Sequence, residues 1–380
     1  MMWTDSRGDA VQMDVPVMEA MESRLLLSTT VDLVNGKAFT YIEADGDRVT
    51  VKLTGGGSGV ITFEGELGSA VESLVVDPNV NGKSKLTISV KKAKKTGDGS
   101  VEIGELTVNG VLASLKAPKV DFVGNLTMDV GRKASIVVGN MFESTMTLSG
   151  EASTVSVRVG VLFNSEIIAA DSAVALQVSW AMVSNVRAFT FAKITVKSDY
   201  IGGAITAAGV NAKGVSIGGI NMKGTLDATI TAPGAITGIT ALEISGGSVT
   251  ADSLGKLVVK GQKPKRKNSF ISLDGDMLAT IELAGENVGA KNTLGSTSVK
   301  GTLGGDVTVT GNAATITMKN LTANLTVSGK AAVRTQDVLS TTRPDEPAGE
   351  IHLGSGSVRS GRVTTRYAGE VDLFVVVPVI

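Results

Sequence analysis

The chain has 380 residues, with 36 basic and 37 acidic side chains, one histidine and no cysteine. This balance excludes a global electrostatic attraction to nucleic acid or to an anionic membrane, and the lack of thiols excludes disulfides, thiolate zinc sites and cysteine nucleophiles. Glycine is frequent at 46 residues and aromatic side chains make up only 4%, which predicts an all-β fold of short strands and tight turns. No apolar run approaches the ~18 residues of a membrane span.

The first 30 residues differ from the rest of the chain because they contain almost no glycine. The spacing of apolar side chains predicts a short helix around residues 17–27. The segment lacks the basic start and the apolar stretch of a classical secretory signal. We therefore expect residues 1–30 to form a leader with a short helix and no classical signal peptide.

Residues 31–66 predict a β-meander that caps the N-terminal end of the fold. Alternating residues over 39–43 and 48–53 flank an Asp-Gly pair, which is a strong hairpin signal. A glycine-rich turn at 55–59 then leads into a third strand over 60–64.

From residue 67 to residue 330 one unit recurs, a short alternating strand closed by glycine or by a polar residue. Examples are the segments Leu106 to Gly110, Leu257 to Gly261 and Leu325 to Gly329. The closures are irregularly spaced, which suits stacked turns of chain with loops of variable length. The unit predicts a parallel β-solenoid, or β-helix, in which Leu106 and Val108 face inward while Thr107 and Asn109 face outward. An antiparallel sandwich is the competing fold.

The last 50 residues divide into two parts. Residues 331–350 contain Pro344, Pro347 and several charges, so we expect a loop or linker there. Residues 351–380 return to alternating strands, which we expect to cap the exposed end of the solenoid. The predicted fold class is thus a parallel β-solenoid with a short N-terminal helical leader, an N-terminal β-meander and C-terminal capping strands.

The segment 18–28 resembles the N-terminal motif of the LEPR-XLL family, which has the form Leu-Glu-Pro-Arg-x-Leu-Leu. The matching residues are Glu22, Arg24, Leu26 and Leu27. Met21 and Ser23 stand where the family has Leu and Pro. The motif heads large extracellular β-repeat proteins, chiefly of planctomycete bacteria. The resemblance therefore implies export to the cell surface or the medium, and it implies no enzymatic activity.

Glu43, Asp45 and Asp47 place three carboxylates within five residues. Calcium prefers clustered oxygen ligands, so these residues are a candidate calcium site, although the twelve-residue EF-hand loop is absent. The alternative is a plain type I′ turn. No other cofactor is expected.

Two basic runs interrupt or follow strands and are expected to be protruding, exposed loops. Their residues are Lys91, Lys92, Lys94, Lys95, Lys263, Lys265, Arg266 and Lys267. Their functional alternative is contact with an anionic polysaccharide or a cell-envelope polymer. Nucleic acid is not expected as a partner, because no aromatic side chains interleave with the lysines.

Two further features carry candidate chemistry. Trp180, Phe189 and Phe191 form a local aromatic group that is either core or a platform for stacking a ligand. His352 lies in an alternating segment, 350–354, and is expected to be a satisfied or exposed strand histidine.

No paired set of acids has a spacing that points to catalysis. We therefore expect a non-enzymatic extracellular or cell-surface protein of structural, adhesin-like type. The alternatives are a carbohydrate-active β-helix enzyme, either a polysaccharide lyase or a hydrolase, or a polysaccharide-binding module. The enzyme would need several acids that line one groove.

Overall fold

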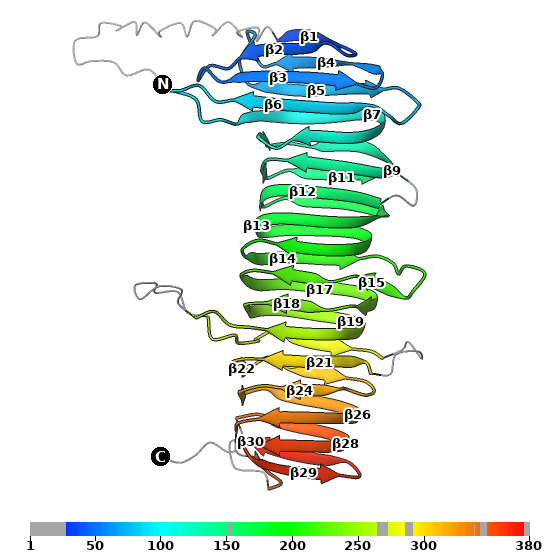
Figure 1. Cartoon of the computed structure of the whole chain (residues 1–380), viewed down its shortest axis with the longest axis vertical. Helices are drawn as coiled ribbons and strands as arrows, with labels where there is room; N and C mark the ends of the chain where they lie inside the picture. Colours follow the sequence, from blue (N-terminus) through cyan, green and yellow to red (C-terminus); the bar gives the residue numbers. More distant parts are fainter. Residues whose placement is uncertain are drawn as a thin grey trace, which may run out of the picture.

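The computed structural model describes residues 28–150, 154–263, 273–285, 292–337, 339–342 and 348–375. All regular secondary structure in this part of the chain is β-strand, and 28 of the strands belong to one sheet. The chain winds along a long axis, so the N-terminal and C-terminal strands lie at opposite ends (Figure 1). None of the residues described forms a helix that could cross a membrane. The helix expected over 17–27 lies outside them.

The N-terminal end is antiparallel. Its strands are β1 (Thr29–Val34), β2 (Ala38–Ile42), β3 (Arg48–Thr54) and β4 (Gly57–Phe63). The hairpin predicted at the Asp-Gly pair is confirmed as β2 and β3. The rest of the meander is wrong, because β4 pairs with β1 while β3 pairs with β6. Three consecutive glycines with positive φ, Gly55, Gly56 and Gly57, carry the chain across to the other side instead of into a second hairpin.

Strands from β5 to β28 form the parallel body, in which neighbouring strands run in the same direction. The first of them are β5 (Val71–Pro78), β6 (Lys85–Lys91), β7 (Val101–Ala117), β8 (Val120–Phe122), β9 (Leu126–Val138), β10 (Met141–Phe142), β11 (Thr145–Ser149), β12 (Thr154–Phe163) and β13 (Glu166–Val196). The next are β14 (Tyr200–Ala207), β15 (Val215–Ile217), β16 (Ile220–Met222), β17 (Thr225–Ile236), β18 (Ile239–Ala241), β19 (Glu243–Val259), β20 (Thr280–Leu283) and β21 (Leu294–Val299). The last are β22 (Thr302–Leu303), β23 (Val307–Val309), β24 (Thr315–Thr317), β25 (Asn320–Leu321), β26 (Asn324–Thr335) and β28 (Glu350–Ser360).

Equivalent residues of successive turns lie side by side in this body. Leu106 is beside Leu126, and Leu126 is beside Met146. The predicted parallel neighbours and the predicted inward phase are confirmed here, since Leu106 and Val108 are buried and Asn109 is exposed.

The predicted fold class, a parallel β-solenoid, is contradicted, while the helical leader predicted with it lies outside the described residues. The sheet closes as a seven-stranded parallel barrel with extra strands, and the described ranges contain no helix. The physical reason is that alternation of apolar residues determines which face of a strand is buried, but every closed parallel sheet requires the same alternation. The sequence pattern therefore does not determine how the sheet closes.

One hydrophobic core runs through the whole molecule, from Leu33 in β1 to Val375 in the last strand. Aliphatic side chains dominate it, because facing walls leave little room for rings. Val309 is only 1% exposed, whereas its neighbour Thr308 faces solvent. The alternation therefore holds in the short strands of the C-terminal half as well.

A row of buried serines lines one corner of the body. Ser144 and Ser165 donate their backbone N–H groups to the hydroxyls of Ser165 and Ser184 in the next turns, at 3.3 and 3.2 Å. The residue before each of these serines has a left-handed backbone, and these residues are Glu143, Asn164 and Val183. The same motif, a left-handed residue followed by a serine, thus recurs at this corner, and the serine hydroxyls accept hydrogen bonds from buried backbone N–H groups.

The C-terminal end is again antiparallel. Strands β29 (Val363–Tyr367) and β30 (Val371–Val375) both pair with β28, and the short β27 (Leu339–Ser340) pairs with β30. The segment 331–350 was expected to be a loop or linker. Its first residues instead belong to β26, which continues to Thr335.

Candidate functional sites

The loop between β2 and β3 gathers three carboxylates. Glu43, Asp45 and Asp47 each offer an oxygen within 4.8 Å of the others. The loop spans residues 43–47 and is closed by hydrogen bonds from the Glu43 N–H to the Asp47 carbonyl and from the Gly46 N–H to the Glu43 carbonyl, both 2.9 Å. It is therefore longer than the two-residue type I′ turn that was the alternative to a calcium site.

Asp47 is completely buried and organises the loop that follows β6. Its carboxylate accepts hydrogen bonds from the backbone N–H groups of Ala93 and Gly99, both at 2.6 Å. Gly97 packs against it so closely that a Cβ there would lie 1.6 Å from the carboxylate oxygen. Asp45 accepts a further hydrogen bond from the Asp98 N–H at 3.1 Å. Two segments about 50 residues apart are thus joined by carboxylates.

Glu43 is the unsatisfied member of the group. Its Oε2 atom is buried and has no hydrogen-bond partner. Burial, followed by the charges of the surrounding carboxylates, raises the pKa of Glu43 to about 7. The acids lining the adjacent hollow of about 330 Å³ are Glu43, Asp45, Asp98, Glu102 and Asp121. A proton or a cation would therefore be stabilised beside Glu43.

These acids also bear on the alternative of a carbohydrate-active enzyme. Glycosidase carboxyl groups stand roughly 5–9.5 Å apart, so that a sugar or a water fits between them. The oxygens of Glu43, Asp45 and Asp47 are closer together than that, and backbone N–H groups already hold the two aspartates. The geometry suits holding a cation better than flanking a glycosidic bond.

The first basic run is exposed, as predicted. Lys91, Lys92, Lys94 and Lys95 all face solvent. The loop is nevertheless anchored, because the N–H of Ala93 within it binds Asp47. In the second run Lys263 is exposed, whereas Lys265, Arg266 and Lys267 lie outside the described residues.

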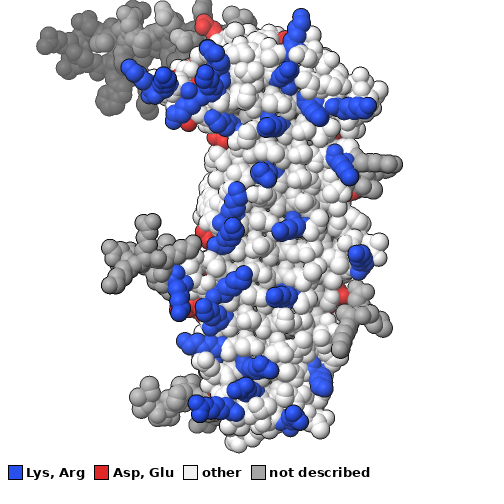
Figure 2. Space-filling view, in the orientation of Figure 1, with Lys and Arg blue, Asp and Glu red and all other residues white. Residues whose placement is uncertain are grey.

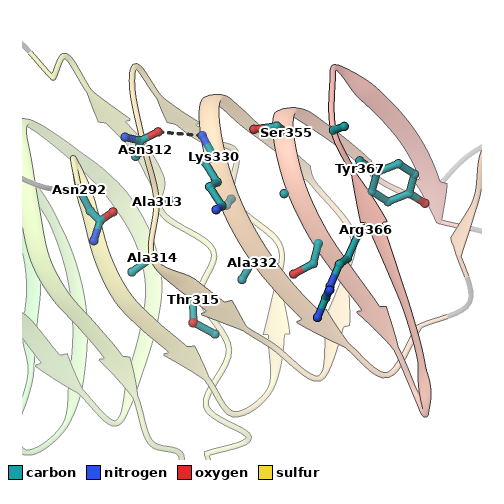
Figure 3. A pocket seen from close by; sticks show the side chains of 14 residues that line it. Asn292, Asn312, Ala313, Ala314, Thr315, Lys330, Ala332, Ser355, Arg366 and Tyr367 are labelled. Atoms are coloured by element: carbon teal, nitrogen blue, oxygen red, sulfur yellow. Dashed lines mark hydrogen bonds between the residues drawn. The ribbon is translucent and has the colours of Figure 1, made fainter.

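A groove of about 890 Å³ crosses the C-terminal part of the body (Figure 3). Lys330, Arg366 and Tyr367 line it, and alanine, serine and glycine residues form much of the rest. Thr315, Ala332, Ser357 and Arg366 lie side by side on β24, β26, β28 and β29. The sequence pattern missed this groove because its residues are separated along the chain and only strand pairing brings them together.

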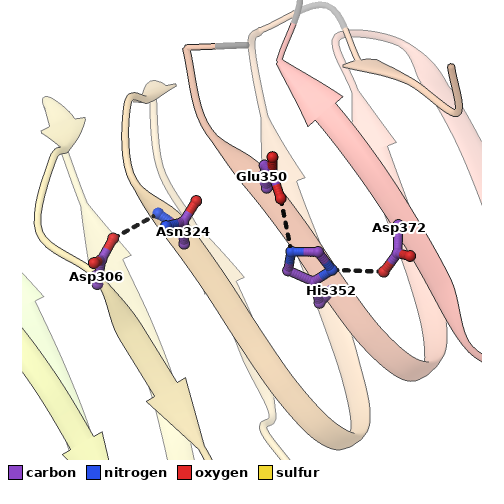
Figure 4. A network of polar contacts seen from close by, with 5 residues as sticks. All are labelled: Asp306, Asn324, Glu350, His352 and Asp372. Atoms are coloured by element: carbon purple, nitrogen blue, oxygen red, sulfur yellow. Dashed lines mark hydrogen bonds and ion pairs between the residues drawn. The ribbon is translucent and has the colours of Figure 1, made fainter. Parts of the chain in front are cut away.

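His352 is held between two carboxylates (Figure 4). Its Nδ1 lies 2.6 Å from Asp372 on β30, and its Nε2 lies 3.0 Å from Glu350 on its own strand. Burial would lower the pKa of His352, but the hydrogen bonds and charges of Asp372 and Glu350 outweigh it and raise the pKa. Both ring nitrogens have partners, so the residue ties β28 to β30, in agreement with a satisfied strand histidine.

The aromatic residues expected to form a local group have different surroundings. Phe191 is buried, Trp180 is partly buried and Phe189 is 43% exposed. The core interpretation therefore holds for Phe191, and Phe189 projects from the sheet.

Comparison with known proteins gives no relative from which a function could be transferred. No protein-family model, no curated protein and no solved structure matches the chain. The LEPR-like motif lies in residues that, apart from Ser28, are outside those described. Function must therefore be inferred from the geometry above.

Proposed function

We propose that the chain is a non-enzymatic, extracellular or cell-surface protein of structural, adhesin-like type. The observation that supports this most is the single core that continues from Leu33 to Val375. A continuous core with paired strands along its whole length makes a stiff, elongated body, which can hold its two ends apart. The resemblance of residues 18–28 to the LEPR-XLL motif supports a place outside the cell.

Incubation with a panel of soluble and insoluble polysaccharides tests the non-enzymatic part of this proposal. We expect the protein to leave every polymer intact, with no new reducing ends and no unsaturated products. Steady release of either product would support the carbohydrate-active enzyme instead. Fractionation of the source cells tests the location, and recovery in the cytoplasm alone would contradict it.

Binding of a divalent cation, calcium by the chemistry of the ligands, is a second candidate function. The buried, unpartnered Oε2 of Glu43 favours it, together with the carboxylates of Asp45 and Asp47. Three carboxylate oxygens would supply part of the six to eight oxygen ligands that calcium takes. The raised pKa of Glu43 means that a bound cation would displace a proton.

Thermal unfolding with and without calcium at pH 8 tests the cation site. Calcium should raise the unfolding temperature of the natural protein, because a ligand that binds the folded state stabilises it. Glu43→Gln should abolish the shift, and Glu282→Gln, at an exposed position on β20, should leave it unchanged. An equal shift in all three proteins would place calcium elsewhere.

A further inference from the structure

One outer wall of the parallel body is strongly basic. It is formed by strands that run in the same direction in successive turns, and it includes the end of β13, then β16, β18, the end of β19, β21, β24 and the ends of β26 and β28. We call it the basic wall. β18, β21 and β24 face the viewer in Figure 1, and the same view shows Lys and Arg along most of the molecule, with Asp and Glu near the margins (Figure 2).

The first outward row of the basic wall lies where its strands end, and it contains five exposed lysines. Each donates its backbone N–H to a carbonyl of the preceding turn at 3.0–3.1 Å, and they are Lys197, Lys223, Lys260, Lys300 and Lys319. Leu242 takes the sixth position, between Lys223 and Lys260. Because neighbouring strands are about 4.8 Å apart, the row spans about 24 Å along the molecule. We call it the lysine row.

The second outward row, two residues earlier on the same strands, is mostly made of hydroxyl and amide side chains. Its members include Thr195, Asn221, Thr240, Ser298 and Thr317. The row ends in Arg334 and Arg359, which are exposed and directly opposite each other on β26 and β28. Like charges in opposite positions destabilise a sheet unless an anion lies between them.

The cations of the wall are available to a ligand. Within the described part of the chain, none of the five lysines of the row forms an ion pair, and neither does Arg334. No Asp or Glu occupies the two outward rows from β16 to β28. Positive charge therefore gathers within the two rows although the whole chain is nearly neutral, and the neighbouring carboxylates Asp199 and Asp276 lie outside the rows, beside Gly224 and Gly301 at the corner that follows the lysines.

We infer that the basic wall binds a linear acidic polysaccharide, with its long axis along the lysine row. Carboxylate or sulfate groups would lie beside the lysines, and sugar hydroxyls would meet the hydroxyls and amides of the second row. This inference rests on the proposed adhesin-like function and names its partner. The rows contain no aromatic side chain on which nucleobases could stack, which favours a sugar polymer over a single-stranded nucleic acid.

The groove of Figure 3 extends the same wall at its C-terminal end. Thr315, Ala332 and Ser357 belong to the third outward row, and the strand pairing continues it to Arg366. A polymer that follows the wall toward the C-terminus would therefore pass Lys330 on β26 and then reach Arg366 on β29, both of which line the groove.

Binding of the full chain to immobilised heparin and polygalacturonate tests the inference. The wall variant carries Lys260→Gln, Lys300→Gln and Lys319→Gln, and the matched control carries Lys37→Gln, Lys83→Gln and Lys213→Gln at exposed loop positions. The wall variant should lose at least about tenfold in affinity. The slope of its log affinity against log salt concentration should become less negative by about 2–3. The control should change less than twofold. Heparin disaccharide should compete poorly because it cannot span the row.

The outcomes separate this inference from the proposed function. Equal losses in both variants would overturn the basic wall as the binding surface, and so would no loss in either, while the structural role would stand. Absence of binding by the natural protein would also overturn it. Tighter binding to poly(dT) than to either polysaccharide would overturn the sugar assignment. Circular dichroism of both variants should match that of the natural protein, since all six lysines are exposed.

Discussion

The parallel body and the N-terminal loop site bring side chains together in different ways. In the body, strand pairing places equivalent positions of successive turns beside one another, so a property such as the charge of Lys260 and Lys300 repeats along a row. At the N-terminal end, two loops meet once, and Asp47 joins them through single hydrogen bonds. Repetition produces extended surfaces that suit polymers, whereas convergence produces a small pocket that suits an ion.

The largest effect should come from disturbing the interior of the body. Val309→Asp would bury an unpaired carboxylate among aliphatic side chains and should cost several kcal/mol of unfolding free energy. Thr308→Asp, one residue earlier, should cost far less because that side chain faces solvent. Denaturant unfolding compares the two variants directly, and equal losses would mean that inward and outward rows are not distinct.

Removal of the carboxylate that joins the N-terminal loops should have a smaller and more local effect. Asp47→Ala leaves the N–H groups of Ala93 and Gly99 without their acceptor and should cost about 2–4 kcal/mol. Proteolysis should increase first in the loop 92–100. Asp32→Ala, at an exposed position on β1, is the control and should change little. A variant whose loop stays resistant would show that convergence on Asp47 does not hold this end together.

The pH dependence of the unfolding free energy tests the N-terminal loop site through Glu43. Folding raises the pKa of Glu43 from its ordinary value of 4.5 to about 7. Between these values the folded state binds more protons than the unfolded state, so stability should fall as pH rises from about 4.5 to 7 and then level off. After allowance for solvent screening, this contribution is on the order of 1 kcal/mol. Glu43→Gln should remove it, and a pH profile unchanged by the substitution would contradict the assignment.

The smallest change in unfolding free energy is expected at the serine-lined corner of the body. Val183 has a left-handed backbone with a φ of 48°, which is unfavourable for a β-branched residue, while Asn164 holds the equivalent corner one turn earlier with a φ of 46°. Val183→Asn should raise the unfolding free energy by about 0.5–1 kcal/mol, and Asn164→Val should lower it by a similar amount. Shifts of the same sign in both variants would show that the two corners are not equivalent.

Sequence reasoning predicted those features that depend on neighbours along the chain. The alternation around Leu106 and Val309 correctly identified buried positions, and the Asp-Gly pair identified the first hairpin. It failed where contacts between distant segments decide the outcome. The closure of the sheet and the crossing of β4 to the other side of the molecule depend on strand pairing.

The candidate sites follow the same division. The carboxylates of Glu43, Asp45 and Asp47 are close in sequence and were therefore found, but their link to the loop 92–100 was not. The lysine row was missed, because loops of different length make the intervals between its members irregular. The two basic runs, in contrast, are recognisable in the sequence because their lysines are adjacent. Spatial rows have no fixed sequence period when each turn has its own loops.

The distance between Lys197 and Lys319 tests most directly the claim that strand pairing builds the lysine row. The chain has no cysteine, so Lys197→Cys with Lys319→Cys creates the only two sites for spin labels. Five strand spacings separate the two residues, and electron–electron double resonance should give a single narrow distribution near 24 Å, broadened by the label linkers. A broad distribution, or a maximum beyond about twice that distance, would contradict the row and with it the proposed surface for an acidic polysaccharide.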